Sequence, residues 1–195
     1  MFGLSRLLIG SKTKSAARAL YAASVDRARS PSFNTDCAVP DTIDGRFELV
    51  SLHTYLILRR LRGVPGQAAM VAQETFDTMF SDYDSILREM GVGDAGVAKR
   101  IKAMAEGFTG RMHAYDAGLP EVPEDDPERA TKVAALKQAL IRNLYREEEP
   151  ASDVLEMMTH YVYAQARHLA RLSDGDVVAG RVSFADMGTM AGRAA

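Results

Sequence analysis

The chain has 195 residues, of which 47% are hydrophobic and 26% charged, a composition that predicts one globular domain with a substantial core. Its net charge of -2 gives no overall attraction for nucleic acid, and its single cysteine, Cys37, excludes an intrachain disulfide and a cysteine-based zinc site. No apolar run approaches the roughly 18 residues that span a bilayer, so we predict no transmembrane helix.

Residues 1–29 predict a basic, amphipathic helical arm. Residues 1–25 carry basic side chains and no acidic one, and the helical spacing is interrupted near Gly10 and Ser11. Such an arm favours binding to an anionic bilayer surface. An arm packed on the body of the protein and a transit-like leader are the alternatives. The residues predicted to meet a membrane surface are Leu4, Arg6, Leu7, Leu8, Lys12 and Lys14.

Residues 30–42 contain two prolines and predict a loop, and a helix follows as far as Arg62. Either Asp41 or Thr42 is placed to accept hydrogen bonds from the amides of the first turn, and Asp44 puts negative charge at the positive end of the helix. Together with Gly45, Asp41 and Asp44 are expected to set the helix start. The apolar stripe of this helix is wide enough to be buried on more than one side, and it contains Leu49, Leu52, His53 and Leu56.

The next helical pattern covers residues 65–90, with a break near residues 81–82. It ends at a tight turn in residues 91–94. Gly91 is expected to adopt the left-handed conformation that closes a helix, Gly93 to continue the turn, and Asp94 to cap the following helix. The sequence therefore predicts two helices joined with little slack.

Three more helical patterns cover residues 97–115, 127–147 and 153–172, and an acidic loop separates the first two. Only residues 177–184 favour short extended structure. The predicted fold is all-α: a single irregular bundle of six or seven helices, with at most a very short strand pair near the C-terminus. We predict an N-terminal arm at residues 1–29, a helical domain at residues 30–184 and a flexible tail at residues 185–195.

Motifs for catalysis and metal binding are missing from the sequence. A di-iron bundle needs two Glu-x-x-His pairs, and none occurs; phosphate-binding glycine loops and the Gly-x-Ser-x-Gly motif do not occur either. His53 in the apolar stripe and His160, four residues after Glu156, leave a haem- or small-molecule-binding bundle as an alternative function. A core histidine and an ordinary surface pair are the simpler explanations. We predict no enzyme activity, no cofactor and no metal site.

Two oppositely charged segments indicate a surface that binds a partner. The helix of residues 43–62 is basic toward its end, and the segment after residue 76 carries several aspartates. These charges are expected either to pair with each other across adjacent helices or to meet a partner, with aromatic and methionine side chains supplying adaptable apolar contacts. The residues predicted to contact a partner are Arg46, Phe47, Arg59, Arg60, Asp77, Asp82, Arg88, Glu89 and Met90.

Three stretches of the chain resemble a known family. They are VPDTIDGRFEL at residues 39–49 with RRLR at residues 59–62, FDTMFSDYD at residues 76–84 with LREMGVGD at residues 87–94, and KRI at residues 99–101 with AYD at residues 114–116. Together they resemble the ubiquinol-cytochrome c chaperone family, which comprises assembly factors of the respiratory cytochrome bc complex. The resemblance extends roughly from residue 21 to residue 172.

The resemblance implies an α-helical, non-enzymatic chaperone that holds newly synthesised cytochrome b during biogenesis of the ubiquinol-cytochrome c reductase complex. The chain resembles a bacterial member because it is short and shows no long leader. Mitochondrial members work with a small second assembly factor, and the need for one here stays open. The expected location is the cytoplasm, with a peripheral position on the inner membrane as the alternative. No nucleic-acid partner is expected.

Overall fold

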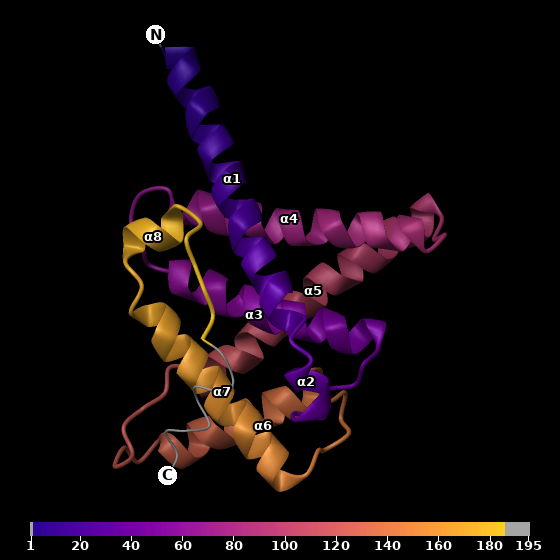
Figure 1. The fold of residues 1–195 in the computed structure, drawn as a ribbon, viewed down its shortest axis with the longest axis vertical. Helices are drawn as coiled ribbons and strands as arrows, with labels where there is room; N and C mark the ends of the chain where they lie inside the picture. The colour runs from indigo at the N-terminus through magenta and orange to yellow at the C-terminus, as the bar shows by residue number, and fades with distance from the viewer. Residues whose placement is uncertain (1, 186–195) are drawn as a thin grey trace.

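The computed structural model describes residues 2–185, which form eight helices and, within that range, no strand (Figure 1). The prediction of an all-α bundle is confirmed, and six of these helices are long. In chain order the helices are α1 (Phe2–Ala28), α2 (Ser32–Thr35), α3 (Ile43–Leu61), α4 (Ala68–Glu89), α5 (Asp94–Gly118), α6 (Arg129–Asn143), α7 (Ser152–Ala170) and α8 (Asp174–Val178).

Helix α3 lies at the centre of the fold. Every residue from Phe47 to Ile57 is buried, and the helix packs against α1, α4, α7 and α8. A helix with neighbours on several sides must be apolar over most of its circumference. This arrangement explains the wide apolar stripe in the sequence of residues 43–62.

A small apolar cluster joins α1, α3, α4 and α8 beside the main core. Helix α1 therefore contributes buried side chains from Thr13 onward, whereas its first part extends beyond the other helices (Figure 1). The packed portion of α1 also contributes Tyr21 and Ala28 to the main core. The buried members of the cluster are Ala16, Leu20, Ile57, Leu61, Ala68, Val71 and Val177.

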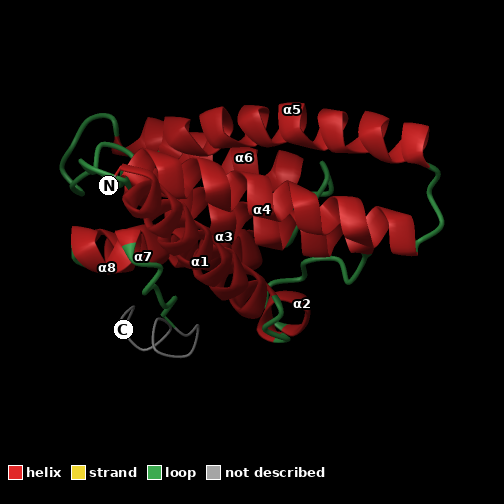
Figure 2. Ribbon diagram, turned by 90° about the horizontal axis from the view of Figure 1, so that it is seen from above, coloured by secondary structure: helices red, strands yellow, loops and turns green. Residues whose placement is uncertain are grey.

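Helices α4 and α5 contact each other and meet at a tip that lies away from the other helices (Figure 1 and Figure 2). At the tip, Gly91 adopts a φ of 80° and its N–H donates to the carbonyl of Arg88 at 2.9 Å, as predicted for a left-handed cap. The prediction that Asp94 caps α5 is wrong, because Gly93 occupies that position. The carboxylate of Asp94 instead accepts a hydrogen bond from Arg88 and so ties the two helices together.

Of the two caps predicted for α3, Asp41 and Thr42, the structure has Thr42. Thr42 caps the helix, since its hydroxyl accepts from the N–H of Gly45 at 3.0 Å. Asp41 is not the cap because its carboxylate pairs with Arg46 at 2.8 Å. Asp44 lies in the first turn, as expected, and pairs with Arg146.

Two predicted helix breaks and one predicted extended segment are absent from the described residues. Helix α1 continues through Gly10, because one glycine costs a helix only about 1 kcal/mol, and α4 continues through residues 81–82. Residues 177–184 contain no strand; the Ser173 hydroxyl accepts from the N–H of Asp176 at 3.1 Å and starts α8 instead. Apart from Ala185, the predicted flexible tail lies outside the described residues.

Candidate functional site

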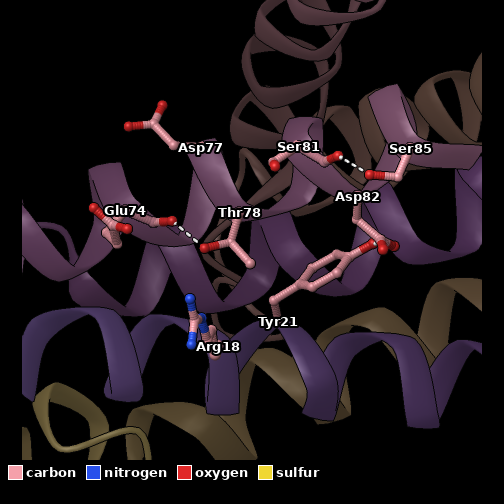
Figure 3. A pocket seen from close by; sticks show the side chains of 8 residues that line it. All are labelled: Arg18, Tyr21, Glu74, Asp77, Thr78, Ser81, Asp82 and Ser85. Atoms are coloured by element: carbon pink, nitrogen blue, oxygen red, sulfur yellow. Dashed lines mark hydrogen bonds between the residues drawn. The ribbon is translucent and has the colours of Figure 1, made fainter. Parts of the chain in front are cut away.

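A polar groove lies between α1 and α4 and has a volume of about 420 Å³. Figure 3 shows the side chains of α1 facing those of α4 across it. Three of its side chains are carboxylates and one is a guanidinium, so the groove favours cationic groups. Its lining residues are Arg18, Tyr21, Glu74, Asp77, Thr78, Ser81, Asp82 and Ser85.

The contact between Tyr21 and Asp82 joins the two walls of the polar groove. The Tyr21 hydroxyl donates to Asp82 Oδ2 at 2.6 Å, and so joins α1 to α4 (Figure 3). Burial and this hydrogen bond raise the pKa of Tyr21 above its ordinary value, which keeps the hydroxyl protonated. Asp77 accepts from Gln73 at 2.8 Å on its own helix. Both aspartates remain exposed to solvent.

An apolar groove lies on another side of α4 and has a volume of about 490 Å³. The end of α3, the loop before α4, the start of α4 and one residue of α5 form its walls. Most of the lining side chains are aliphatic or aromatic. Arg62 and Gln73 are the polar side chains of the lining. The lining residues are Leu58, Leu61, Arg62, Gly63, Val64, Ala69, Ala72, Gln73, Phe76 and Met112.

The residues predicted to contact a partner separate into an exposed and an enclosed group. The exposed group is spread over three places: Arg46 at the start of α3, Asp77 and Asp82 in the polar groove, and the remainder near the tip of α4. At the tip, Met90 is 51% exposed, and Arg88 binds both Asp84 and Asp94. The exposed residues of the tip are Arg88, Glu89 and Met90.

The enclosed group is held by contacts within the chain. Phe47 packs edge-on against Tyr83, with the ring centroids 4.8 Å apart, and is only 8% exposed. The Arg60 side chain donates to the carbonyl of Leu169 at 3.0 Å and to Asp174 at 2.6 Å. In this conformation neither side chain presents its binding groups to a partner.

The arginines of α3 do not pair with the acidic side of α4, which was one of the two expectations. Arg59 and Arg62 instead face Asp116 of α5, at 3.7 Å and 2.8 Å. Among the described residues, no ion pair joins these arginines to Asp77 or Asp82. The aspartates of the polar groove therefore keep negative charge that the basic end of α3 does not neutralise.

The structure describes the side chains of only part of the predicted membrane-binding arm. The side chains of Lys12 and Lys14 are exposed on α1. Those of Leu4, Arg6, Leu7 and Leu8 lie outside the described side chains. Within residues 2–185, none of the helices combines the length and apolar content that crossing a bilayer requires.

His53 is completely buried, and both of its ring nitrogens have partners. Nδ1 donates to the carbonyl of Leu49 at 2.7 Å, which leaves Nε2 to accept from the Tyr161 hydroxyl at 2.6 Å. Arg27 donates to the same hydroxyl at 3.0 Å, and the Phe184 ring stands edge-on to the imidazole. Burial lowers the pKa of His53 from its ordinary value of 6.5 to about 3, so the ring is neutral.

The other candidate ligand, His160, lies on the exposed side of α7. Glu156, with which it was expected to share a helix face, binds Lys137. No three His, Cys, Asp or Glu side chains of the described region gather closely enough to hold a metal ion. His53 and His160 thus occupy quite different surroundings and do not form one site.

The predicted site residues did not include Arg18, Tyr21 and Glu74 of the polar groove. Glu74 could have been found, because the polar residues of α4 recur at helical spacing. Arg18 and Tyr21 could not, because they belong to α1, and Tyr21 reaches a residue 61 positions away. No local pattern encodes a contact at that separation.

A crystal structure from Brucella abortus, described as that of the Cbp3 homolog, resembles the whole molecule. It aligns with a TM-score of 0.79 and 34% sequence identity, over 96% of this chain and 98% of that one. A family model described as ubiquinol-cytochrome C chaperone matches residues 35–184. The chain belongs to the ubiquinol-cytochrome c chaperone family.

Eukaryotic members of the ubiquinol-cytochrome c chaperone family are more distant in sequence. The ubiquinol-cytochrome-c reductase complex assembly factor 1 of Xenopus laevis is 26% identical over 86% of this chain and 78% of its own length. The yeast Saccharomyces cerevisiae has "Protein CBP3, mitochondrial", 29% identical over 80% of this chain. This chain spans 45% of the yeast protein and 55% of the human assembly factor 1. This chain thus covers a larger share of the Xenopus protein than of the yeast and human proteins.

Proposed function

We propose that the protein is a chaperone for assembly of ubiquinol-cytochrome c reductase, and that its client is newly synthesised cytochrome b. Membership of the ubiquinol-cytochrome c chaperone family supports the first part, as do the names of the Xenopus and human relatives. The client is the apolar, membrane-embedded subunit for which a holding chaperone is needed before assembly. The protein carries out no chemical step in this role.

The apolar groove is the feature that supports our choice of the client-binding surface. A protein that holds an apolar helix needs an accessible apolar concavity, and a groove between helices is the usual form. Ala69 and Ala72 form a low wall on α4, while Phe76 and Met112 offer larger contacts. Met70, on the same helix, is 51% exposed. In this proposal the apolar groove receives an apolar segment of cytochrome b.

The charged surfaces have secondary roles in the proposal. Exposed Arg88, Glu89 and Met90 at the tip of α4 and α5 contact polar loops of the client. The exposed Lys12 and Lys14 lie on the helix that extends beyond the bundle, and they favour a peripheral position on the cytoplasmic side of the inner membrane. Each basic residue near an anionic bilayer contributes about 1 kcal/mol of attraction.

The decisive experiment replaces the gene in its native host with variants and measures the amount of assembled reductase. The deletion strain is expected to lose assembled complex and cytochrome b. Ala69→Lys places a cation on the exposed wall of the apolar groove, so the variant should keep its melting temperature but fail to co-purify cytochrome b. The matched control is Ala134→Lys, because Ala134 is exposed on α6, and it should restore assembly.

Two outcomes would contradict separate parts of the proposal. Normal levels of the complex in the deletion strain would refute the assembly function. Equal recovery of cytochrome b with Ala69→Lys and Ala134→Lys would remove the client from the apolar groove, even if the assembly function stands. Melting curves of both variants show whether either change acts through folding.

A further inference from the structure

Arg62 is the charged residue of the apolar groove. It follows the last residue of α3, Leu61, and its side chain is 55% exposed. The other lining residues are uncharged, so no carboxylate lines the groove. The surface that we assign to the client is therefore apolar over most of its walls and positively charged at one place.

A carboxylate of the neighbouring helix holds the Arg62 guanidinium beside the groove. Nη1 of Arg62 donates to Asp116 Oδ2 at 2.8 Å. Asp116 lies one turn after Met112, which lines the groove from α5. An arginine carries several N–H donors, and among the described residues this is the one hydrogen bond that the Arg62 side chain makes. Its remaining donors are available to a ligand in the groove.

Asp116 does not balance the positive charge at this end of α3. It faces two arginines, because Arg59 Nε lies 3.7 Å from Asp116 Oδ1. That oxygen already accepts from the Tyr55 hydroxyl at 2.8 Å, and Arg59 Nε is shielded from solvent without a hydrogen-bond partner among the described residues. Neither arginine forms an ion pair with another described residue. Two guanidiniums thus share one carboxylate, which leaves a net positive charge beside the groove.

The walls of the apolar groove favour a helix as its occupant. Ala69 and Ala72 lie three positions apart on one face of α4. Such short side chains let the backbone of another helix come close, and binding in a groove of this kind uses the apolar face of that helix. A carboxylate beside the apolar face would meet the unbalanced charge at Arg62, whereas an amine there would be repelled.

We propose that the apolar groove selects a helical segment of cytochrome b whose apolar face ends at an aspartate or a glutamate, and that Arg62 binds this carboxylate. The selection rests on the proposed function, since cytochrome b is the client in both. It adds the chemistry of the client segment and the residue that recognises it. Arg62 is a specificity-determining residue in this arrangement, and the apolar walls supply the rest of the contact.

Site-specific photo-crosslinking in the native host identifies the client segment. A photoreactive amino acid replaces Gln73, which is exposed and lines the apolar groove, in the full chain. Mass spectrometry of the cross-linked product is expected to give an apolar segment of cytochrome b with an acidic residue within one turn of its end. The matched control carries the same amino acid at Thr109, which is exposed on α5 outside the groove, and it should not give this product.

Matched peptides then measure what Arg62 contributes. The cross-linked segment is synthesised with its acidic residue and with the corresponding amide in its place, and fluorescence anisotropy in a mild detergent gives the Kd of each peptide for the full chain. The unaltered protein should bind the acidic peptide about fivefold more tightly, which is the upper end of what an exposed ion pair contributes.

Three variants show whether this preference comes from Arg62. Arg62→Gln should bind the two peptides equally, and Arg62→Lys should keep most of the preference because it keeps the charge. The matched control is Arg100→Gln, because Arg100 is exposed on α5 and does not line the groove, and it should behave like the unaltered protein. Melting curves show whether any of the changes acts through folding.

An exchange of charges tests the same contact inside the host. Replacement of the acidic residue of the client segment by lysine should lower the yield of the cross-link with the unaltered protein. Arg62→Glu should restore the yield, because it places a carboxylate opposite the new lysine. Arg100→Glu should not restore it.

The outcomes separate the role of Arg62 from the function of the groove. A cytochrome b segment without an acidic residue would overturn the role of Arg62 and leave the proposed function standing, as would an unchanged preference for the acidic peptide in Arg62→Gln. The absence of a cross-link to cytochrome b at position 73 would remove the client from the groove and overturn both. A cross-link to lipid in place of protein would do the same.

Discussion

Hydrogen bonds around the buried His53 join three helices, α1, α3 and α7. The imidazole links the carbonyl of Leu49 to the hydroxyl of Tyr161, and Arg27 of α1 binds the same hydroxyl. Because both ring nitrogens are engaged, a metal or haem iron could bind only after these bonds were broken. The geometry therefore supports a structural role for His53, and the ordinary explanation of a core histidine is sufficient.

Stability should depend on pH through His53. Its pKa of about 3 in the folded protein lies below the ordinary value of 6.5, so as the pH falls the unfolded chain takes up a proton that the folded chain does not. The free energy of unfolding should therefore decrease by about 1.4 kcal/mol per pH unit from about pH 6 to about pH 4. Urea unfolding of the protein and of His53→Gln across this range measures the slope. Parallel curves for the two proteins would contradict the prediction.

At the scale of elements, the start of α3 depends on a close approach between two backbone segments. A Cβ atom on Gly45 would lie 2.0 Å from the carbonyl oxygen of Pro40. The same residue donates its N–H to the capping Thr42. The loop before α3 can fold over the first turn only because residue 45 has no side chain.

Gly45→Ala should consequently destabilise the protein by about 1–3 kcal/mol, in spite of the higher helix propensity of alanine. Gly110→Ala on α5 is the matched control, because a Cβ there would meet no atom within 4 Å. It should stabilise the protein by roughly 0.5–1 kcal/mol. Thermal unfolding measures both changes. A stabilising effect of Gly45→Ala would show that the approach of Pro40 is not a constraint.

Helix α4 shows how far the sequence predicts an element and where the prediction stops. Its periodic apolar residues predicted the buried face, and Met79, Phe80 and Tyr83 are indeed buried. Its glycine turn predicted the end correctly. The helix is flanked by the polar groove and the apolar groove, and those depend on which helices lie beside it. Spacing along one helix does not specify its neighbours.

At the scale of the whole molecule, α1 is required for the packing of the domain that the family model covers. The match begins at residue 35, yet α1 packs against both α3 and α4. Leu20 is fully buried, and Tyr21 is hydrogen-bonded to Asp82. A core completed by an earlier helix is not stable without it.

Deletion of residues 2–29 should therefore abolish cooperative unfolding, because it exposes apolar surface on α3 and α4. Deletion of residues 2–11 is the matched control, since it keeps α1 from Lys12 onward, including every buried residue described for that helix. Circular dichroism during heating distinguishes the two. A cooperative transition at an unchanged temperature after the longer deletion would contradict the prediction.

The candidate site was less predictable than the fold, and Arg60 shows why. Its place near the end of a long helix indicated a partner-binding cation, whereas in the structure it binds the carbonyl of Leu169 and the carboxylate of Asp174, 109 and 114 positions away. The exposed residues of the tip were easier to predict, because a tight turn between long helices must face solvent. Charge alone does not distinguish a contact residue from one that fixes the fold.

The Gln165 side chain of α7 holds the segment that follows α8. Its amide nitrogen donates to the carbonyl of Ala185 at 2.6 Å, and its oxygen accepts from the N–H of the same residue at 3.0 Å. One side chain thus provides the donor and the acceptor that a neighbouring strand would provide, which lets an extended segment end in a helical protein without a sheet. Slow hydrogen exchange at the Ala185 amide would then report whether the segment after α8 is docked, and it would do so at a single, assignable position.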